Sequence, residues 1–126
     1  MPRNAYAQDA VVMMEPGGSP NAPGGAIATA LCGGWDHEPP CPLAPHHVTH
    51  QVITNETGKT ELALRVLFAT RPADESQVRR LIGDALEAGE LTGPDGVVTT
   101  WRLKSTAASD IRPSETDRAA ELIAHH

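Results

Sequence analysis

Most residues of this chain that could bind a metal ion or carry out thiol chemistry lie in one stretch, residues 32–50. The chain has two cysteines and six histidines among 126 residues, and six of these eight fall in the stretch. They are Cys32, His37, Cys41, His46, His47 and His50. Thiolate and imidazole are the ligands that Zn²⁺ prefers, and they also suit copper, nickel and iron ions. The stretch is therefore the first candidate for a functional site, with zinc as the expected ion.

The spacing of these residues matches no standard zinc finger or zinc ribbon, so geometry has to select the ligands. If the chain is extended from His46 onward, His46 and His50 share one face at a separation of roughly 13 Å, and His47 points to the other face. Because zinc–ligand bonds are only about 2 Å long, no more than two of these three histidines can join one site. We predict a Cys₂His₂ site formed by Cys32, His37, Cys41 and either His46 or His47.

Two carboxylates flank one of the predicted ligands. Asp36 and Glu38 stand on either side of His37, where they could orient the second ring nitrogen of a metal-bound imidazole. Four protein ligands leave no coordination position for a substrate, which favours an interaction or regulatory protein over an enzyme. If one cysteine stays away, three ligands and a water form an open zinc or iron site of a small metalloenzyme. Glu38 or Asp36 is then the candidate base.

The same residues also have interpretations that involve no metal. Cys32 and Cys41 fit two buried thiols, or a disulfide or redox pair if the protein is exported. Adjacent histidines at the start of a strand are often simply solvated. The alternative function is then a metal-free binding module that uses a sheet face or forms a homodimer.

The bulk composition argues against several classes of function. The net charge is −6, with 10 basic against 16 acidic residues, so the cationic surface that nucleic-acid binding requires is missing. No apolar run approaches the ~20 residues needed to cross a membrane. The segment 1–6 has one basic residue and no apolar stretch after it, so we expect no signal peptide and a cytoplasmic protein. The expected partners are a metal ion and either a protein partner or a second copy of the chain.

The candidate stretch lies within a chain rich in glycine and proline, with eleven of each. They concentrate in two tracts, 15–25 and 33–45, which we expect to form irregular loops of one domain that spans 1–126. Between the tracts, 26–32 is a run of small apolar residues that fits either a strand or a short helix.

Alternating apolar residues predict several strands. The clearest are 48–54 and 60–69, a hairpin around the glycine-bearing turn 55–58. In its second strand one face consists of apolar residues, namely Leu62, Leu64, Val66 and Phe68. Further strands are expected at 10–14 and 97–103.

Helical spacing predicts two helices. The first opens at 72–74, has an apolar face and a polar face that includes Arg79, and ends at Gly89 or Gly93. Its apolar face consists of Val78, Leu81, Ile82, Ala85 and Leu86. A short helix follows the acidic cap at 114–117. This order of elements predicts an α+β fold, a two-layer sandwich with a mainly antiparallel sheet and helices on one face, with a ferredoxin-like topology as one candidate.

Overall fold

The protein folds as a curled antiparallel sheet with helices on both of its faces. The computed structural model describes residues 3–16, 18–32, 44–54, 60–93 and 96–124. The strands lie in the order β2-β3-β1-β5-β4. They are β1 (Asn4–Met14), β2 (His46–Thr54), β3 (Thr60–Thr70), β4 (Glu90–Thr92) and β5 (Val98–Ser109). The α-helices of the described residues are α1 (Ala22–Cys32), α2 (Glu75–Ala88) and α3 (Thr116–Ala124). The predicted α+β class and antiparallel sheet are confirmed.

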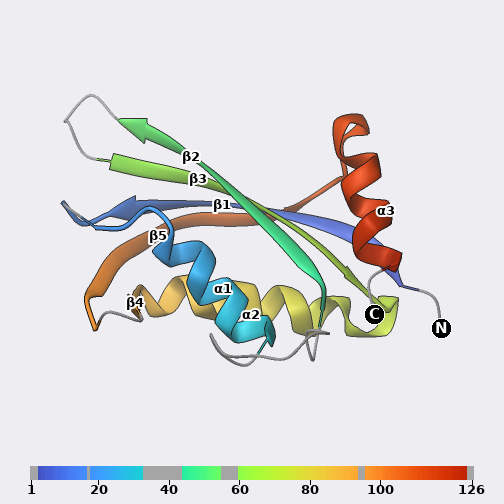
Figure 1. Ribbon diagram of the computed structural model, residues 1–126, viewed down its shortest axis with the longest axis horizontal. Helices are drawn as coiled ribbons and strands as arrows, with labels where there is room; N and C mark the ends of the chain where they lie inside the picture. The colour runs from blue at the N-terminus through green and yellow to red at the C-terminus, as the bar shows by residue number, and fades with distance from the viewer. Residues whose placement is uncertain (1–2, 17, 33–43, 55–59, 94–95, 125–126) are drawn as a thin grey trace.

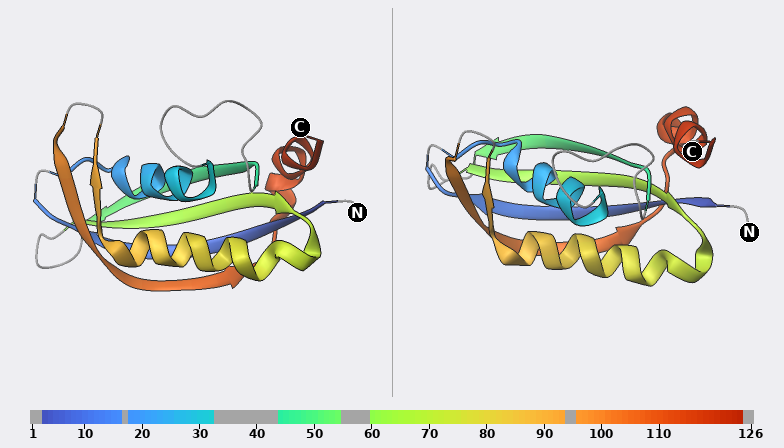
Figure 2. Two further views of the ribbon diagram at one scale, coloured as in Figure 1. Left: turned by 90° about the horizontal axis from the view of Figure 1, so that it is seen from below. Right: turned by 60° about the horizontal axis from the view of Figure 1, so that its bottom comes forward.

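The main core lies between the sheet and the two longer helices. Figures 1 and 2 show α1 and α2 side by side on one face of the sheet. The β3 residues predicted to share a face all belong to this core, as do the buried α2 residues Val78, Ile82 and Leu86. Trp101 closes one end of the core, and its indole N–H donates to the Leu86 carbonyl at 2.9 Å. The alternating apolar residues of β3 and the apolar residues at helical spacing in α2 thus pack against each other in one core.

The third helix lies on the opposite face of the sheet, which corrects the prediction that all helices share one face (Figure 1). Leu122 of α3 is in a separate apolar cluster with Ala7, Leu67 and Ala69. Leu67 and Ala69 flank the core residue Phe68 on β3, so their side chains point away from α1 and α2. Because α1 and α2 already cover the first face, the short apolar stripe of α3 is buried against the second.

Helix α1 begins inside a tract that was predicted to be loop. The Asn21 carbonyl accepts the Gly25 N–H at 3.0 Å, which starts the helix. Pro23 stands in the first turn, where a missing N–H costs no helical hydrogen bond. Ile27 and Leu31 are fully buried in the core. The helical alternative for 26–32 is therefore confirmed, and the loop prediction for 15–25 is wrong from residue 22 onward.

The strands are longer than their sequence patterns indicated. The predicted hairpin is confirmed, with β2 and β3 paired from His46–Phe68 to Thr54–Thr60; its turn, 55–59, lies outside the described residues. β1 extends back to Asn4, which pairs with Thr70. β5 runs on to Ser109, and the short strand β4 was not predicted at all.

A glycine with a left-handed backbone conformation ends α2, and β4 begins at the next residue. Gly89 is the C-cap residue, with φ of 74°, so the first of the two predicted stops is confirmed. A Cβ atom at this position would lie 2.7 Å from the Trp101 carbonyl oxygen. Only glycine satisfies both the backbone angle and this close approach.

Candidate functional site

The structure places three of the five predicted metal ligands, and they lie at the two ends of the segment that joins α1 to β2. Cys32 is the last residue of α1, and His46 and His47 are the first two of β2. His37 and Cys41 lie outside the described residues, as do Asp36 and Glu38, so their predicted roles stay predictions. Both ends of the segment are held by the same core, because Leu31 and Ala44 are each fully buried in it.

The sheet register separates the two adjacent histidines. His46 pairs with Phe68, whose side chain lies in the core beneath α1 and α2, whereas His47 pairs with Leu67 on the face that α3 covers in part. Directly paired residues of an antiparallel sheet point to the same face. His46 is therefore on the helix side of the sheet, together with α1 and its final residue Cys32, and His47 is on the other side. His50 shares the face of His46 but lies further along the strand.

The imidazole of His46 is held by a backbone hydrogen bond. Its Nδ1 lies 3.1 Å from the Ala44 carbonyl oxygen. A carbonyl oxygen only accepts, so this contact is a hydrogen bond when Nδ1 carries the proton. Metal-bound histidines are typically fixed in this way by a carbonyl on the nitrogen that does not bind. Among the described residues, no group of three or more His, Cys, Asp or Glu is arranged to hold a metal ion.

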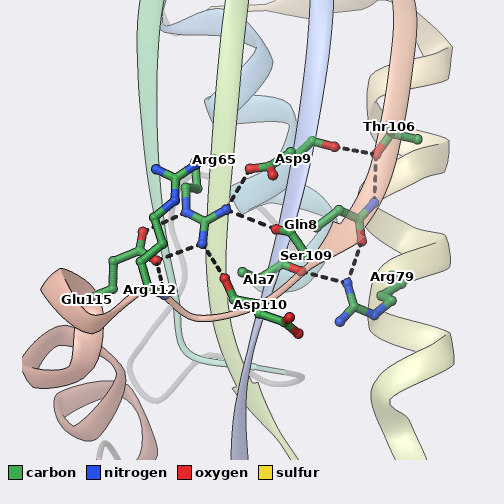
Figure 3. A network of polar contacts seen from close by, with 10 residues as sticks. All are labelled: Ala7, Gln8, Asp9, Arg65, Arg79, Thr106, Ser109, Asp110, Arg112 and Glu115. Carbon is green, nitrogen blue, oxygen red and sulfur yellow. Dashed lines mark hydrogen bonds and ion pairs between the residues drawn. The ribbon is translucent and has the colours of Figure 1, made fainter.

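A second polar cluster, which the sequence reasoning missed, surrounds Arg65 on the α3 side of the sheet (Figure 3). The guanidinium donates to both oxygens of Glu115 at 2.6 and 2.7 Å and to the Asp9 carboxylate at 2.8 Å. It also donates to the Ser109 hydroxyl at 2.9 Å and the Asp110 carbonyl at 2.7 Å. These five bonds use the five N–H groups of the side chain.

The bonding of the Arg65 cluster shows what it can do. An arginine that binds an anionic substrate needs N–H groups that can point toward it, and Arg65 has none to spare. Glu115 accepts a third hydrogen bond, from the Arg112 backbone N–H at 2.8 Å. The hydrogen bonds from Arg65 lower the pKa of Glu115 from 4.5 to about 2 and raise the pKa of Arg65 itself. The cluster is a set of ion pairs and hydrogen bonds that joins the sheet to the segment leading into α3.

A third group of polar contacts joins α2 to the first half of the central strand β1. Arg79 donates to the Ala7 carbonyl at 2.9 Å (Figure 3), and its guanidinium lies over the rings of Tyr6 and Phe68, 5.6 and 5.2 Å from their centroids. Arg79, predicted on the polar face of its helix, therefore contacts the sheet through its guanidinium. Its guanidinium stacks on aromatic rings, a common arrangement for arginine.

One feature of the sequence could have indicated the Arg65 cluster. Arg65 lies between Ala63 and Leu67 on one face of β3, where its nearest neighbours along the strand are apolar. A charge at such a position requires a partner from elsewhere in the chain. The partners, at positions 9, 109, 110 and 115, become visible only when the sheet register is known.

Comparison with known proteins adds no further constraint, since no family model, curated protein or solved structure matches the chain. No helix in the described part of the chain is both long and apolar enough to cross a membrane.

Proposed function

We propose that the protein is a metal-binding protein of the interaction or regulatory type, with one zinc ion held by Cys32, His37, Cys41 and His46. The proposal deepens the prediction from the Cys/His spacing by choosing between His46 and His47. The observation that supports this choice most directly is the hydrogen bond from His46 Nδ1 to the Ala44 carbonyl. A hydrogen bond of this kind on one ring nitrogen is typical of imidazoles that bind a metal ion through the other.

The anchoring of the segment ends also supports a site there. Leu31, directly before Cys32, and Ala44, two residues before His46, are both buried in one core. The Pro45 carbonyl in addition accepts the Ala69 N–H at 3.0 Å, which fastens the second end to β3. In both views of Figure 2, the last turn of α1 and the first residues of β2 lie toward the same end of the sheet. Two donors on a rigid scaffold lower the entropy cost of closing a four-ligand site.

Two thiolates and two imidazoles would form a closed tetrahedral site. Such a site stabilises a loop or reports the presence of metal, and it leaves no position for a substrate. This is why we place an interaction or regulatory role ahead of metalloenzyme chemistry. With three protein ligands and a water, Glu38 or Asp36 would instead be positioned to act as a base.

The order of elements supports one further proposal about the fold. The sequence β1-α1-β2-β3-α2-β5 and the strand order β2-β3-β1-β5 are those of a split β-α-β arrangement. We propose a ferredoxin-like topology with β4 added beside β5 and α3 added on the second face.

The metal proposal is tested by elemental analysis of the full chain after equilibration with zinc and removal of unbound ion. We expect one zinc per chain, lost in Cys32→Ser and strongly reduced in His46→Ala. His47→Ala is the matched control, because it removes the neighbouring imidazole on the other face of the sheet and should leave zinc binding intact. Zinc far below one equivalent, or a loss in His47→Ala equal to that in His46→Ala, would contradict the proposal.

Substitution of Co²⁺ then distinguishes the closed site from the open one. A tetrahedral thiolate spectrum that added cyanide leaves unchanged is expected for four protein ligands. A spectrum that shifts with cyanide would show an open coordination position and favour the metalloenzyme.

A further inference from the structure

The two edges of the sheet differ in how they are protected from pairing with another strand. Edge strands expose unpaired N–H and C=O groups, and proteins usually protect them by shortness, charged residues, proline or bulges. β4 has two of these features, since it is three residues long and begins with Glu90. β2, at the other edge, is nine residues long. It contains no Asp, Glu, Lys, Arg or Pro, and its register with β3 is continuous.

In the part of the chain that the structure describes, β2 also exposes apolar side chains on both of its faces. Val52 is 52% exposed and Ile53 is 41% exposed. Because adjacent strand residues point to opposite faces, a helix or loop that covered one of them would leave the other in water. An added strand beside β2 would cover both at once.

From these features we propose that β2 pairs in antiparallel fashion with β2 of a second copy of the chain, so that the two sheets become continuous. A two-fold axis at His50 overlaps the whole strand and keeps α1 and α2 of both copies on the same side. In this register Val52 faces Val48 of the second copy, and Ile53 faces His47 of the second copy. Each contact occurs twice by symmetry, as in any isologous interface.

Charge favours a second copy over another occupant. The chain has a net charge of −6, so most surfaces of two copies repel each other. β2 contains no acidic or basic residue apart from its histidines, so pairing of two β2 strands places no acidic side chains opposite each other. A strongly basic or acidic peptide would find no charged partner on this strand. In the proposed register, Val52 of each copy faces Val48 of the other. The same pair of β-branched side chains therefore forms twice, so the strand is complementary to a second copy of itself.

The experiment is sedimentation equilibrium of the full chain in the presence of a metal chelator, which removes association bridged by metal. Its outcome is therefore independent of the zinc proposal. We expect a species of twice 13.3 kDa that dissociates on dilution. Val52→Lys should weaken the dimer by roughly tenfold or more, because each dimer contains the lysine twice. Val98→Lys is the matched control: this valine of β5 is 54% exposed, and its substitution should leave the dimer unchanged.

Amide hydrogen exchange of the unmodified chain keeps the test decisive if the lysine variant fails to fold. We expect slower exchange in β2 at concentrations above the dissociation midpoint than below it, with no such difference in β4. A monomer at every concentration, a dimer equally tight in Val52→Lys, or protection that maps to the α3 face instead of β2 would overturn the proposal.

Discussion

At the scale of single residues, Arg65 is the most heavily bonded side chain described in the molecule. It joins Asp9 on β1, Ser109 at the end of β5 and Glu115 ahead of α3. Its side chain is only 11% exposed. We expect Arg65→Met to lower the free energy of unfolding by about 3 kcal/mol, because it leaves the half-buried Glu115 carboxylate without its cation. Urea denaturation monitored by circular dichroism measures this loss.

The matched control for Arg65→Met is Arg118→Met. Arg118 contacts Glu121 at 3.0 Å, but the two side chains are 51% and 66% exposed. Water screens such a pair, so its loss should cost less than about 1 kcal/mol. Equal losses in the two variants would show that the Arg65 cluster does not stabilise the fold as proposed.

The lowered pKa of Glu115 gives the molecule a defined acid response. Hydrogen bonding to Arg65 lowers this pKa from 4.5 to about 2. A carboxylate with a lower pKa in the folded state stabilises the protein above the unfolded pKa, and this contribution disappears as the pH falls through the folded pKa. We therefore expect stability to decline between pH 4.5 and 2, by about 1 to 2 kcal/mol after screening by solvent.

The variant Glu115→Gln isolates this acid response. Its amide does not titrate, so the variant should be less stable than the unmodified chain at pH 6 and should lose this part of the decline below pH 4.5. Urea denaturation across the pH series provides the measurement. A decline of the same size in the variant would assign the acid response to other carboxylates.

At the scale of elements, the end of α2 depends on a glycine for two separate reasons. Gly89 has φ of 74° and lies so close to the Trp101 carbonyl that a Cβ would be 2.7 Å from the oxygen. Gly96 has a similar φ of 83°, but no atom lies within 4 Å of a Cβ there. We expect Gly96→Ala to cost about 1 kcal/mol for the left-handed backbone alone. Gly89→Ala should cost clearly more, since the clash adds to that penalty.

Thermal unfolding of the two alanine variants tests this comparison. We expect the unmodified chain to have the highest transition midpoint, Gly96→Ala a lower one, and Gly89→Ala the lowest. Equal midpoints for the two variants would mean that β5 moves away from Gly89 without cost.

The elements that could be predicted from the sequence are those with strong periodicity. Alternation in β3 and the 3.6-residue repeat in α2 identify their core faces correctly, because burial of one face imposes the pattern. The first half of β1 contains Ala5, Ala7 and Gln8, residue types with a weak preference for strands. They are in a strand because they pair with the long strand β3 and, from Ala7 onward, with β5. The start of α1 contains Pro23 and two glycines, which are typical of loops, so its pattern did not predict a helix. The face on which α3 packs depends on which surfaces α1 and α2 have already covered.

The candidate metal site was predictable only in part, for a related reason. Residue types and their clustering identify Cys32 and the histidines of β2 as candidates. The choice between His46 and His47 requires the pairing of β2 with β3, which places His46 opposite Phe68. The contacts of Arg65 require the same non-local information, because its partners are at least 44 residues away in sequence.

At the scale of the whole molecule, the proposed metal site would connect the segment between α1 and β2 to the main core. Its two ends are fixed by Leu31 and Ala44, so a metal ion bound between them would stabilise the folded state relative to an unfolded chain that binds it more weakly. Zinc at a hundred times its dissociation constant would add about 2.7 kcal/mol, which raises the thermal midpoint of a chain of this length by roughly 10 °C. Differential scanning calorimetry with zinc and with a chelator measures the difference.

His46→Ala should abolish most of this zinc-dependent rise in the thermal midpoint. His50→Ala should retain the rise, since His50 lies roughly 13 Å along the same face and outside the reach of one ion. A zinc-dependent rise that persists unchanged in His46→Ala would place the stabilising metal elsewhere on the molecule.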